Sequence, residues 1–202
     1  MTRTVVELTP LRAEPSDDAE QVTQALPGEP LTVRSEEDGW AGIRTAYDYP
    51  GWVHADALDG AVDDEWLVER GGDPVEEARA YLGCPYEWGG LTETGIDCSG
   101  LIHMAYRRLG RLVPRDADHQ EAAGTPVPDD ELRRGDLVCY GDHIAFWLGD
   151  GRILHATGRE GVRAVVEEQH PPELAARVRG YVRLGTVPAA SDPSRGGRGR
   201  RT

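Results

Sequence analysis

The sequence predicts an α+β protein, in which a small β-barrel precedes a domain of helices packed on an antiparallel sheet. Residues 1–60 contain short β-type runs separated by Pro-Gly and Asp-Gly turns, and this spacing is typical of a small barrel. Two helix-like segments follow, and five strand-like runs come after them. This change of pattern predicts two structural units of different kinds.

The domain boundaries are placed where the pattern changes. We expect a barrel over residues 1–60, a connector over 61–73 and a second domain over 74–186. Residues 187–202 lack apolar periodicity, so we expect a disordered tail there. The β-type runs expected in the barrel are TVVEL, EQVTQAL, PLTVRS, WAGIRT and GWVHADAL.

The second domain begins with two predicted helices. PVEEARAYLG reads as a helix with Pro near its start, glutamates in its first turn and Gly83 at its end. Leu101, Ala105 and Leu109 lie on one face of a second helix from Cys98 to Leu109. The strand-like runs that follow are DLVCYG, HIAFWLG, RILHATG, VRAVVEE and GYVRLG.

Composition narrows the function classes. The 202-residue chain has 22 basic and 36 acidic residues and a net charge of −14, which argues against nucleic acid or an anionic membrane as the main partner. No apolar run approaches the roughly 20 residues that cross a bilayer. The N-terminus lacks the pattern of a secretion signal, so we expect a cytoplasmic protein. The three cysteines lack metal-site spacing, and we expect no disulfide framework, metal or cofactor.

The stretch GIDCSG contains a cysteine in an unusual setting. Cys98 lies in the first turn of the second predicted helix, and Asp97 is placed to cap that helix. Helix N-termini stabilise anions, and thiolates there can have a pKa well below the usual value of about 8.5. Cys98 is therefore a candidate nucleophile, although an inert buried cysteine is the alternative.

Two histidines are candidates for the base and its orienting partner. HIAFWL and RILHAT are predicted to form a hairpin around Asp150. In that register His143 and His155 are diagonal neighbours on one face, roughly 7–8 Å apart. A slip of one residue would separate them. With Cys98 they would form a nucleophile, base and orienter set.

Four stretches, in order, now suggest a family. YLGCPYEWGG, GIDCSGLIHMAYRRLG, LVPRDADHQ and RRGDLVCYGDHIAFWLGDGRILHATG resemble the NlpC-type papain-like peptidases of bacterial cell-wall metabolism. Members with an N-terminal SH3-like barrel resemble this chain from end to end. The resemblance implies that Cys98 is the nucleophile, His143 the base and His155 the third member.

The resemblance also implies a substrate, a murein peptide. Such proteins are typically γ-D-glutamyl-L-diamino-acid endopeptidases that cut muropeptides with a free N-terminal L-Ala, between D-Glu and meso-diaminopimelate or L-Lys, during recycling. A wall-directed endopeptidase whose barrel binds wall polymer remains an alternative. An amidase or acyltransferase on the same fold, or a non-catalytic binding module, are the others.

Several residues near the nucleophile are candidate ligands. Tyr86 is predicted to share the oxyanion with the Cys98 backbone N–H, or else to be a packed aromatic. Asp97 is predicted to cap its helix, and the resemblance implies that it also helps bind the L-Ala ammonium. Ser99 would donate to the substrate or favour the first helical turn.

Further candidates lie in the PRDADHQ loop and in the barrel. Asp116 is predicted to contact the substrate, while Arg115 would pair with the D-Glu α-carboxylate or with Asp116. In the family the barrel can wall off the cleft, and the resemblance implies amine-binding roles for Glu20 and Tyr49. The alternatives are an exposed acid and a turn aromatic, and Tyr49 has neighbours with which it could be confused, Tyr47 and Asp48. The remaining histidines and cysteines are expected to be surface or packing residues, including His119, His103, Cys84 and Cys139.

Overall fold

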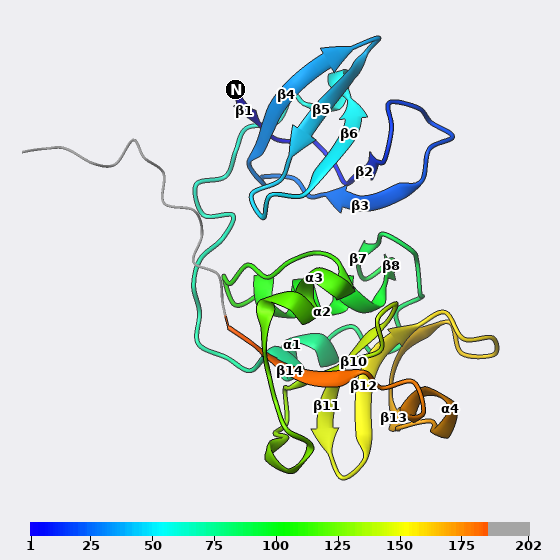
Figure 1. Cartoon of the computed structure of the whole chain (residues 1–202). Coiled ribbons are helices and arrows are strands. Elements are labelled where there is room, and N and C mark those ends of the chain that lie inside the picture. Colours follow the sequence, from blue (N-terminus) through cyan, green and yellow to red (C-terminus); the bar gives the residue numbers. More distant parts are fainter. Residues whose placement is uncertain (186–202) are drawn as a thin grey trace, which may run out of the picture.

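The computed structural model describes residues 1–185, so the predicted tail over 187–202 lies outside the described residues. Figure 1 shows the N-terminal strands above a layer of two helices and a short hairpin, with the second sheet below that layer. The helices are α2 (Cys98–Arg107) and α3 (Ala117–Ala123), and the hairpin is formed by β7 (Leu91–Thr92) and β8 (Gly95–Ile96). Among residues 1–185, no helix is long and apolar enough to cross a membrane.

The N-terminal unit is a six-stranded antiparallel sheet with the strand order β1-β4-β5-β6-β2-β3. Its core contains Leu11, Leu31, Ile43 and Val53. A short 3-10 helix, Ala55–Ala57, follows the last strand. The strands are β1 (Thr2–Arg3), β2 (Thr9–Arg12), β3 (Gln21–Ala25), β4 (Leu31–Glu37), β5 (Trp40–Arg44) and β6 (Pro50–His54).

The prediction of a strand at TVVEL is wrong. Within that run Thr4 forms only an isolated bridge to Gly60, and the next strand begins at Thr9. Thr4 and Val5 are both buried although they are adjacent, whereas Val6 is exposed. The chain bends there, so the alternation of faces that a regular half-buried strand needs is lost.

The helices of the second unit are shorter than predicted. α1 spans Pro74–Arg79 and α2 spans Cys98–Arg107. After each helix the chain tightens into i→i−3 hydrogen bonds, as in the bond from the Tyr81 N–H to the Ala78 carbonyl. The glycines expected as stops, Gly83 and Gly110, follow these turns with positive φ. The other helices are α3 (Ala117–Ala123), η2 (Asp129–Glu131) and α4 (Pro172–Ala175).

The five strand-like runs predicted for the second domain form strands in one antiparallel sheet. The order is β13-β12-β11-β10-β14-β9, and α2 packs against β11 and β12. The strands are β9 (Gly124–Pro126), β10 (Leu137–Cys139), β11 (Ile144–Gly149), β12 (Arg152–Thr157), β13 (Ala164–Gln169) and β14 (Gly180–Leu184). A separate two-stranded hairpin, β7 (Leu91–Thr92) and β8 (Gly95–Ile96), precedes α2.

The predicted register of the β11–β12 hairpin is confirmed. Phe146 lies opposite Leu154 and Trp147 lies opposite Ile153, as a turn at Asp150 requires. The register shifts only beside the turn, where Asp150 has a positive φ of 52°. This pairing places the start of β11, next to His143, beside the end of β12, which contains His155.

Buried polar contacts hold the barrel against the second domain. Arg107 on α2 forms an ion pair of 2.9 Å with Glu29, and both side chains are buried. The Leu91 N–H donates to Gln24 Oε1 at 2.8 Å. Because these groups have lost their water, their mutual bonds are needed to offset desolvation. The barrel is therefore docked on the second domain at the last residue of α2 and at β7.

Candidate active site

Cys98 is the first residue of α2, and Asp97 caps the helix as predicted. Asp97 Oδ1 accepts a hydrogen bond of 2.6 Å from the Gly100 N–H. Cys98 is only 5% exposed, and it lines a cavity of about 340 Å³. Residues from both domains line this cavity, so the cysteine faces a space that neither domain forms alone.

The cysteine is a neutral thiol at rest. Burial and then the Asp97 carboxylate raise the pKa of Cys98 to about 12, against the backbone N–H groups of Ile144 and Ser99 and the Arg115 charge. The depressed pKa expected at a helix N-terminus is therefore outweighed by desolvation. Attack by this sulfur needs a base that removes its proton. The hydrogen bond from the Ile144 N–H places the start of β11 beside the sulfur. His143 is the residue directly before Ile144.

His143 and His155 meet as the hairpin register predicted. His143 Nε2 and His155 Nδ1 are 2.8 Å apart, and the rings are nearly perpendicular. Burial, followed by the neighbouring His155, lowers the pKa of His143 to about 3. His143 is therefore neutral, and its Nδ1 is the ring nitrogen left free of His155.

Glu168 contacts the histidine pair, although it was not among the site residues predicted from the sequence. His155 Nε2 lies 2.9 Å from Glu168 Oε1, and Arg159 Nη2 donates to both oxygens of that carboxylate. Glu168 was visible only as an acid in a predicted strand. His155 lies opposite Val166 across β12 and β13, so Glu168 is a diagonal neighbour of the histidine. The register across the loop at 158–163 was not predicted from the sequence.

Tyr86 lies near the nucleophile and is also packed. Its pKa is raised to about 12 by burial and then by its proximity to the ionisable Cys98 thiol, so its hydroxyl is a neutral donor. A Cβ placed at Gly158 would come within 3.1 Å of the Tyr86 ring, which shows how closely the loop after β12 covers it. The two expectations for Tyr86 are compatible in this position.

Arg115 does not pair with Asp116, which was one of its two expected partners. It instead forms a buried, two-pronged ion pair with Asp97, with nitrogen–oxygen distances of 2.9 and 2.7 Å. Its other donors contact Ser99 Oγ, Thr23 Oγ1 and the Gly90 carbonyl. All five N–H groups are thus engaged inside the protein. A role in binding the D-Glu carboxylate stays a prediction.

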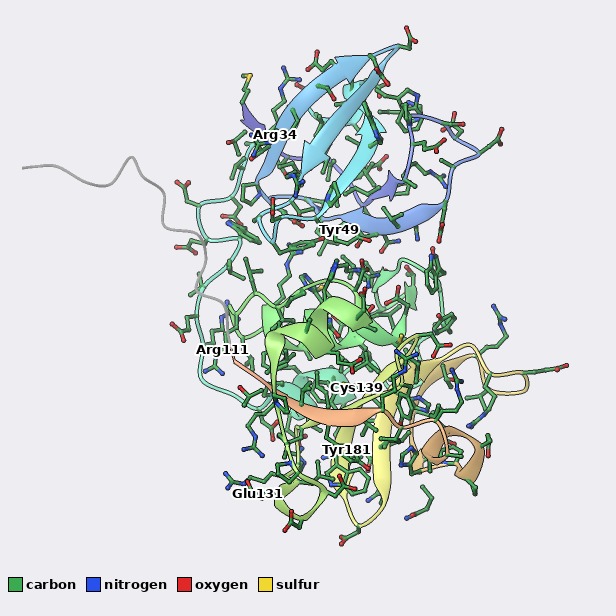
Figure 2. All side chains as sticks on the ribbon, in the orientation of Figure 1. Arg34, Tyr49, Arg111, Glu131, Cys139 and Tyr181 are labelled. Carbon is green, nitrogen blue, oxygen red and sulfur yellow. The ribbon has the colours of Figure 1, made fainter. Side chains whose placement is uncertain are left out.

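Residues from the barrel and the PRDADHQ loop meet at the cavity. The Tyr49 hydroxyl donates to Asp116 Oδ1 at 3.2 Å, which joins the two domains at the rim. Figure 2 shows Tyr49 at the edge of the barrel that faces the second domain. The expected ligands that line the same cavity as Cys98 are Glu20, Tyr49, Asp97, Ser99 and Asp116.

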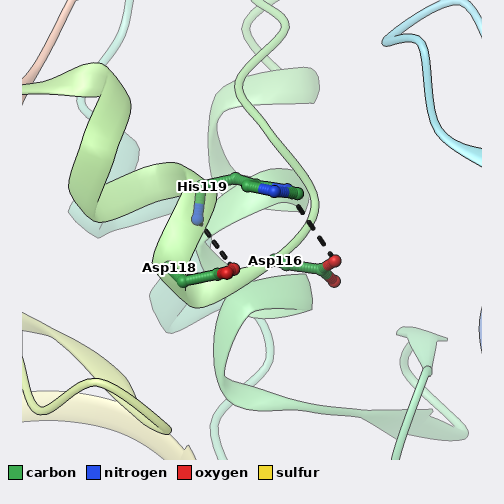
Figure 3. Close-up of side chains that lie close together, drawn as sticks. All are labelled: Asp116, Asp118 and His119. Carbon is green, nitrogen blue, oxygen red and sulfur yellow. Dashed lines mark hydrogen bonds and ion pairs between the residues drawn. The ribbon is translucent and has the colours of Figure 1, made fainter.

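Three groups beside the cavity lie close enough to share a cation. Asp116, Asp118 and His119 offer ligand atoms within 4.8 Å of one another (Figure 3). Asp118 and His119 are exposed, and Asp118 Oδ1 already accepts from the His119 backbone N–H. Exposed acids of this kind are common, so the expectation of no metal stays a prediction.

The other histidine and cysteine expectations can be compared with burial. His119 is a surface residue, with 64% of its side chain exposed. His103 packs instead of facing solvent, and its Nδ1 lies 2.8 Å from the Val113 carbonyl. Cys139 is buried as expected, whereas Cys84 is only partly buried.

This arrangement defines a class of protein. A buried cysteine at the start of a helix, beside a histidine pair on an antiparallel sheet, is the arrangement of papain-like thiol hydrolases. Residues 83–181 match the NlpC/P60 family, and residues 11–58 match the bacterial dipeptidyl-peptidase SH3 domain. The chain belongs to the NlpC/P60 family of cysteine peptidases, with an SH3-like domain at its N-terminal side.

Curated relatives share about a third of their aligned residues with this chain. Dipeptidyl-peptidase 6 of Lysinibacillus sphaericus is 33% identical over 139 residues, which are 65% of this chain and 51% of the relative. The γ-D-glutamyl-L-lysine dipeptidyl-peptidase of Bacillus subtilis is 33% identical over 115 residues, which are 52% of this chain and 39% of the relative. The chain therefore spans about half, or less, of the length of these relatives.

A solved structure shows the same fold. An NlpC/P60 family protein from Bacillus cereus superposes with a TM-score of 0.53 at 23% identity. The superposition covers 91% of this chain and 63% of the other. The coverage includes both domains, so the fold class predicted from the sequence, a barrel followed by a papain-like α+β domain, is confirmed.

Proposed function

We propose that this chain is a cysteine endopeptidase that hydrolyses the γ-D-glutamyl–L-diamino-acid bond of muropeptides with a free N-terminal L-Ala. One observation carries the proposal. The cavity that Cys98 lines is bordered by Glu20 and Tyr49 of the barrel, and Asp116 of the second domain adds another carboxylate. A cavity bordered by a second domain and lined by carboxylates suits a short peptide whose terminus is an ammonium ion.

The amine-binding role falls mainly to Asp116, Glu20 and Tyr49. Asp97 is fully engaged by Arg115, so its charge is largely neutralised inside the protein. Burial raises the pKa of Asp116, while the bond from Tyr49 opposes that rise. A bound ammonium would favour the charged carboxylate and would be paired directly by it. Asp97 and Ser99 then shape the start of α2 and the floor of the cavity.

The proposed reaction uses the groups around Cys98. His143 Nδ1 takes the thiol proton as the sulfur attacks the γ-carbonyl of D-Glu. The Cys98 backbone N–H and the Tyr86 hydroxyl bind the oxyanion. His143 then protonates the leaving amine of the diamino acid. Water, deprotonated by His143, hydrolyses the γ-glutamyl thioester and restores the thiol.

The names of relatives support the substrate class. The Bacillus subtilis relative is named for the γ-D-glutamyl-L-lysine bond, and a Mycobacterium tuberculosis relative is named a peptidoglycan endopeptidase. We further propose a cytoplasmic role in recycling, because a requirement for free L-Ala would confine the enzyme to peptides already released from glycan.

The test is to identify which bond is cut. L-Ala-γ-D-Glu-meso-diaminopimelate and its L-Lys analogue would be incubated with the protein, with Cys98→Ala as the blank, and the products identified by mass. Release of L-Ala-γ-D-Glu from either peptide supports the proposal. If neither is cut while Cys98 still reacts with iodoacetamide, the nucleophile is functional and the proposed substrate is wrong.

A further inference from the structure

We propose that Glu168 is a positioning residue that sets which nitrogen carries the proton on both active-site histidines. The inference rests on the roles proposed for Cys98 and His143. It is carried by a continuous row of contacts: Glu168 Oε1 to His155 Nε2 at 2.9 Å, and His155 Nδ1 to His143 Nε2 at 2.8 Å. Nothing in the reaction described above requires Glu168.

Glu168 acts in this row only as an acceptor. Arg159 Nη2 lies 2.9 and 2.7 Å from its two oxygens. Burial raises the pKa of Glu168, but the bonds from Arg159 and His155 outweigh burial and lower it. An ionised carboxylate offers no proton, so the hydrogen between Glu168 and His155 must belong to His155 Nε2.

The assignment of that one hydrogen determines the next. Burial lowers the pKa of His155, so its ring is neutral and carries a single N–H. With Nε2 protonated, His155 Nδ1 has a lone pair and accepts from His143 Nε2–H. His143 is neutral as well, so its Nδ1 is left with a lone pair. That is the nitrogen to which the proposed reaction assigns the transfer of the thiol proton.

The remaining charged neighbours do not compete for these positions. Asp142 beside His143 is paired with Arg177, and the two oxygen contacts measure 2.5 and 2.7 Å. His170 Nε2 is bonded to the Tyr140 hydroxyl at 2.8 Å. Among residues 1–185, only His143 and Glu168 form hydrogen bonds with the ring nitrogens of His155. Glu168 is therefore the group that orders this pair.

The chain supplies a matched control in the adjacent residue. Glu167 lies on the same strand and is also held by arginines, with Arg79 Nε at 2.9 Å and Arg152 in contact. Glu167→Gln and Glu168→Gln remove one charge each from neighbouring ion pairs, but only Glu168 touches the histidines. A glutamine at 168 can donate as well as accept, so it no longer dictates the tautomer of His155.

The test compares the two variants by histidine ¹⁵N NMR and by the rate at which iodoacetamide modifies Cys98, resolved from Cys84 and Cys139 by peptide mapping. For Glu168→Gln we expect a change in the tautomers of His143 and His155, and alkylation of Cys98 slowed at least about 10-fold, since a wrong tautomer disables a catalytic base. Glu167→Gln should match wild type in both. Where peptide cleavage is measurable, kcat should fall with KM unchanged.

Unchanged tautomers in a folded Glu168→Gln protein would overturn the inference, as would equal losses in both variants. Glu168→Asp keeps an acceptor and should restore wild-type tautomers; failure to do so would also count against it. Neither NMR nor alkylation uses a peptide substrate. A protein that passes both tests but does not cut muropeptides would contradict only the proposed function.

Discussion

Arg115 holds both oxygens of Asp97 from inside the protein, at 2.9 and 2.7 Å, while Asp97 caps the helix that carries Cys98. Arg115 Nε also donates to Thr23 Oγ1 in the barrel at 2.8 Å. A single side chain therefore ties the barrel to the first turn of the helix that begins with Cys98. The barrel contributes to the placement of the cysteine as well as to the wall of the cavity.

Replacing Arg115 should cost much more than replacing an exposed arginine. Arg115→Met leaves Asp97 buried and unpaired, and breaking such a pair costs about 3–5 kcal/mol of unfolding free energy. Arg115→Lys keeps the charge but loses the two-pronged contact, so we expect a partial loss. The control is Arg44→Met, because Arg44 pairs with the exposed Asp48. Its cost in urea unfolding should stay below about 1 kcal/mol; equal losses would contradict a structural role for the buried pair.

The stability cost of Gly89→Ala measures how tightly the barrel packs against the second domain. Its φ is +73°, and a Cβ there would lie 2.7 Å from the backbone oxygen of Gln21 in the barrel. Gly83 has a φ of +83° and open space around it. Alanine at either position pays about 1–2 kcal/mol for a left-handed backbone. Gly89→Ala should lose about 1–3 kcal/mol more than Gly83→Ala in thermal unfolding, because it also overpacks the interface. Equal losses of stability in the two variants would mean that the barrel can shift away from residue 89 at little cost.

His103 should make stability depend on pH. Burial, with the charges of Arg107 and Arg115, lowers its pKa to about 3. Below the ordinary pKa of about 6.5, the unfolded chain takes up a proton that folded His103 refuses, so stability falls as the pH drops from about 6.5 toward 3. One such histidine contributes a slope of up to about 1.4 kcal/mol per pH unit. In His103→Asn, whose amide can replace Nδ1 toward the Val113 carbonyl, this slope should be smaller by about one proton. An unchanged slope would contradict a buried neutral His103.

Tyr86→Phe separates the hydroxyl from the ring. The ring packs beside Gly158, so stability should change little when only the oxygen is removed. Loss of one oxyanion donor raises the barrier by about 2.7–4 kcal/mol, and we expect kcat to fall about 100-fold or more with KM nearly unchanged. Steady-state kinetics on a cleaved muropeptide measure this. A kcat within about 3-fold of wild type would assign Tyr86 to packing alone.

The parts of the fold and site that depend on local pattern could be predicted from the sequence. The helix start at Cys98, its Asp97 cap and the hairpin that joins His143 to His155 all follow from residues close together in the chain. The ion pair of Arg115 with Asp97 could not be predicted, because the partners of Arg115 come from three segments distant from it in sequence. Glu168 was missed although His155 and Arg159 are close to it in sequence, because the register of β12 against β13 was not predicted.

Energies that depend on burial were also beyond the sequence. The helix N-terminus predicted a depressed pKa for Cys98, and only the folded surroundings show that desolvation raises it instead. The strand expected at TVVEL failed for a related reason. Its residues have β propensity, but the closure of the barrel against Gly60 decides their backbone.

In the proposed function, the barrel makes this peptidase select a substrate with a free amine. The most direct measurement is the ratio of kcat/KM for L-Ala-γ-D-Glu-meso-diaminopimelate and its N-acetylated form. We predict that the free amine is preferred by at least about 100-fold, since acetylation leaves the cavity carboxylates unpaired and adds bulk on the side that the barrel borders. A ratio near one would contradict the claim, because the cleft would then be open at the barrel and suited to attached wall peptides.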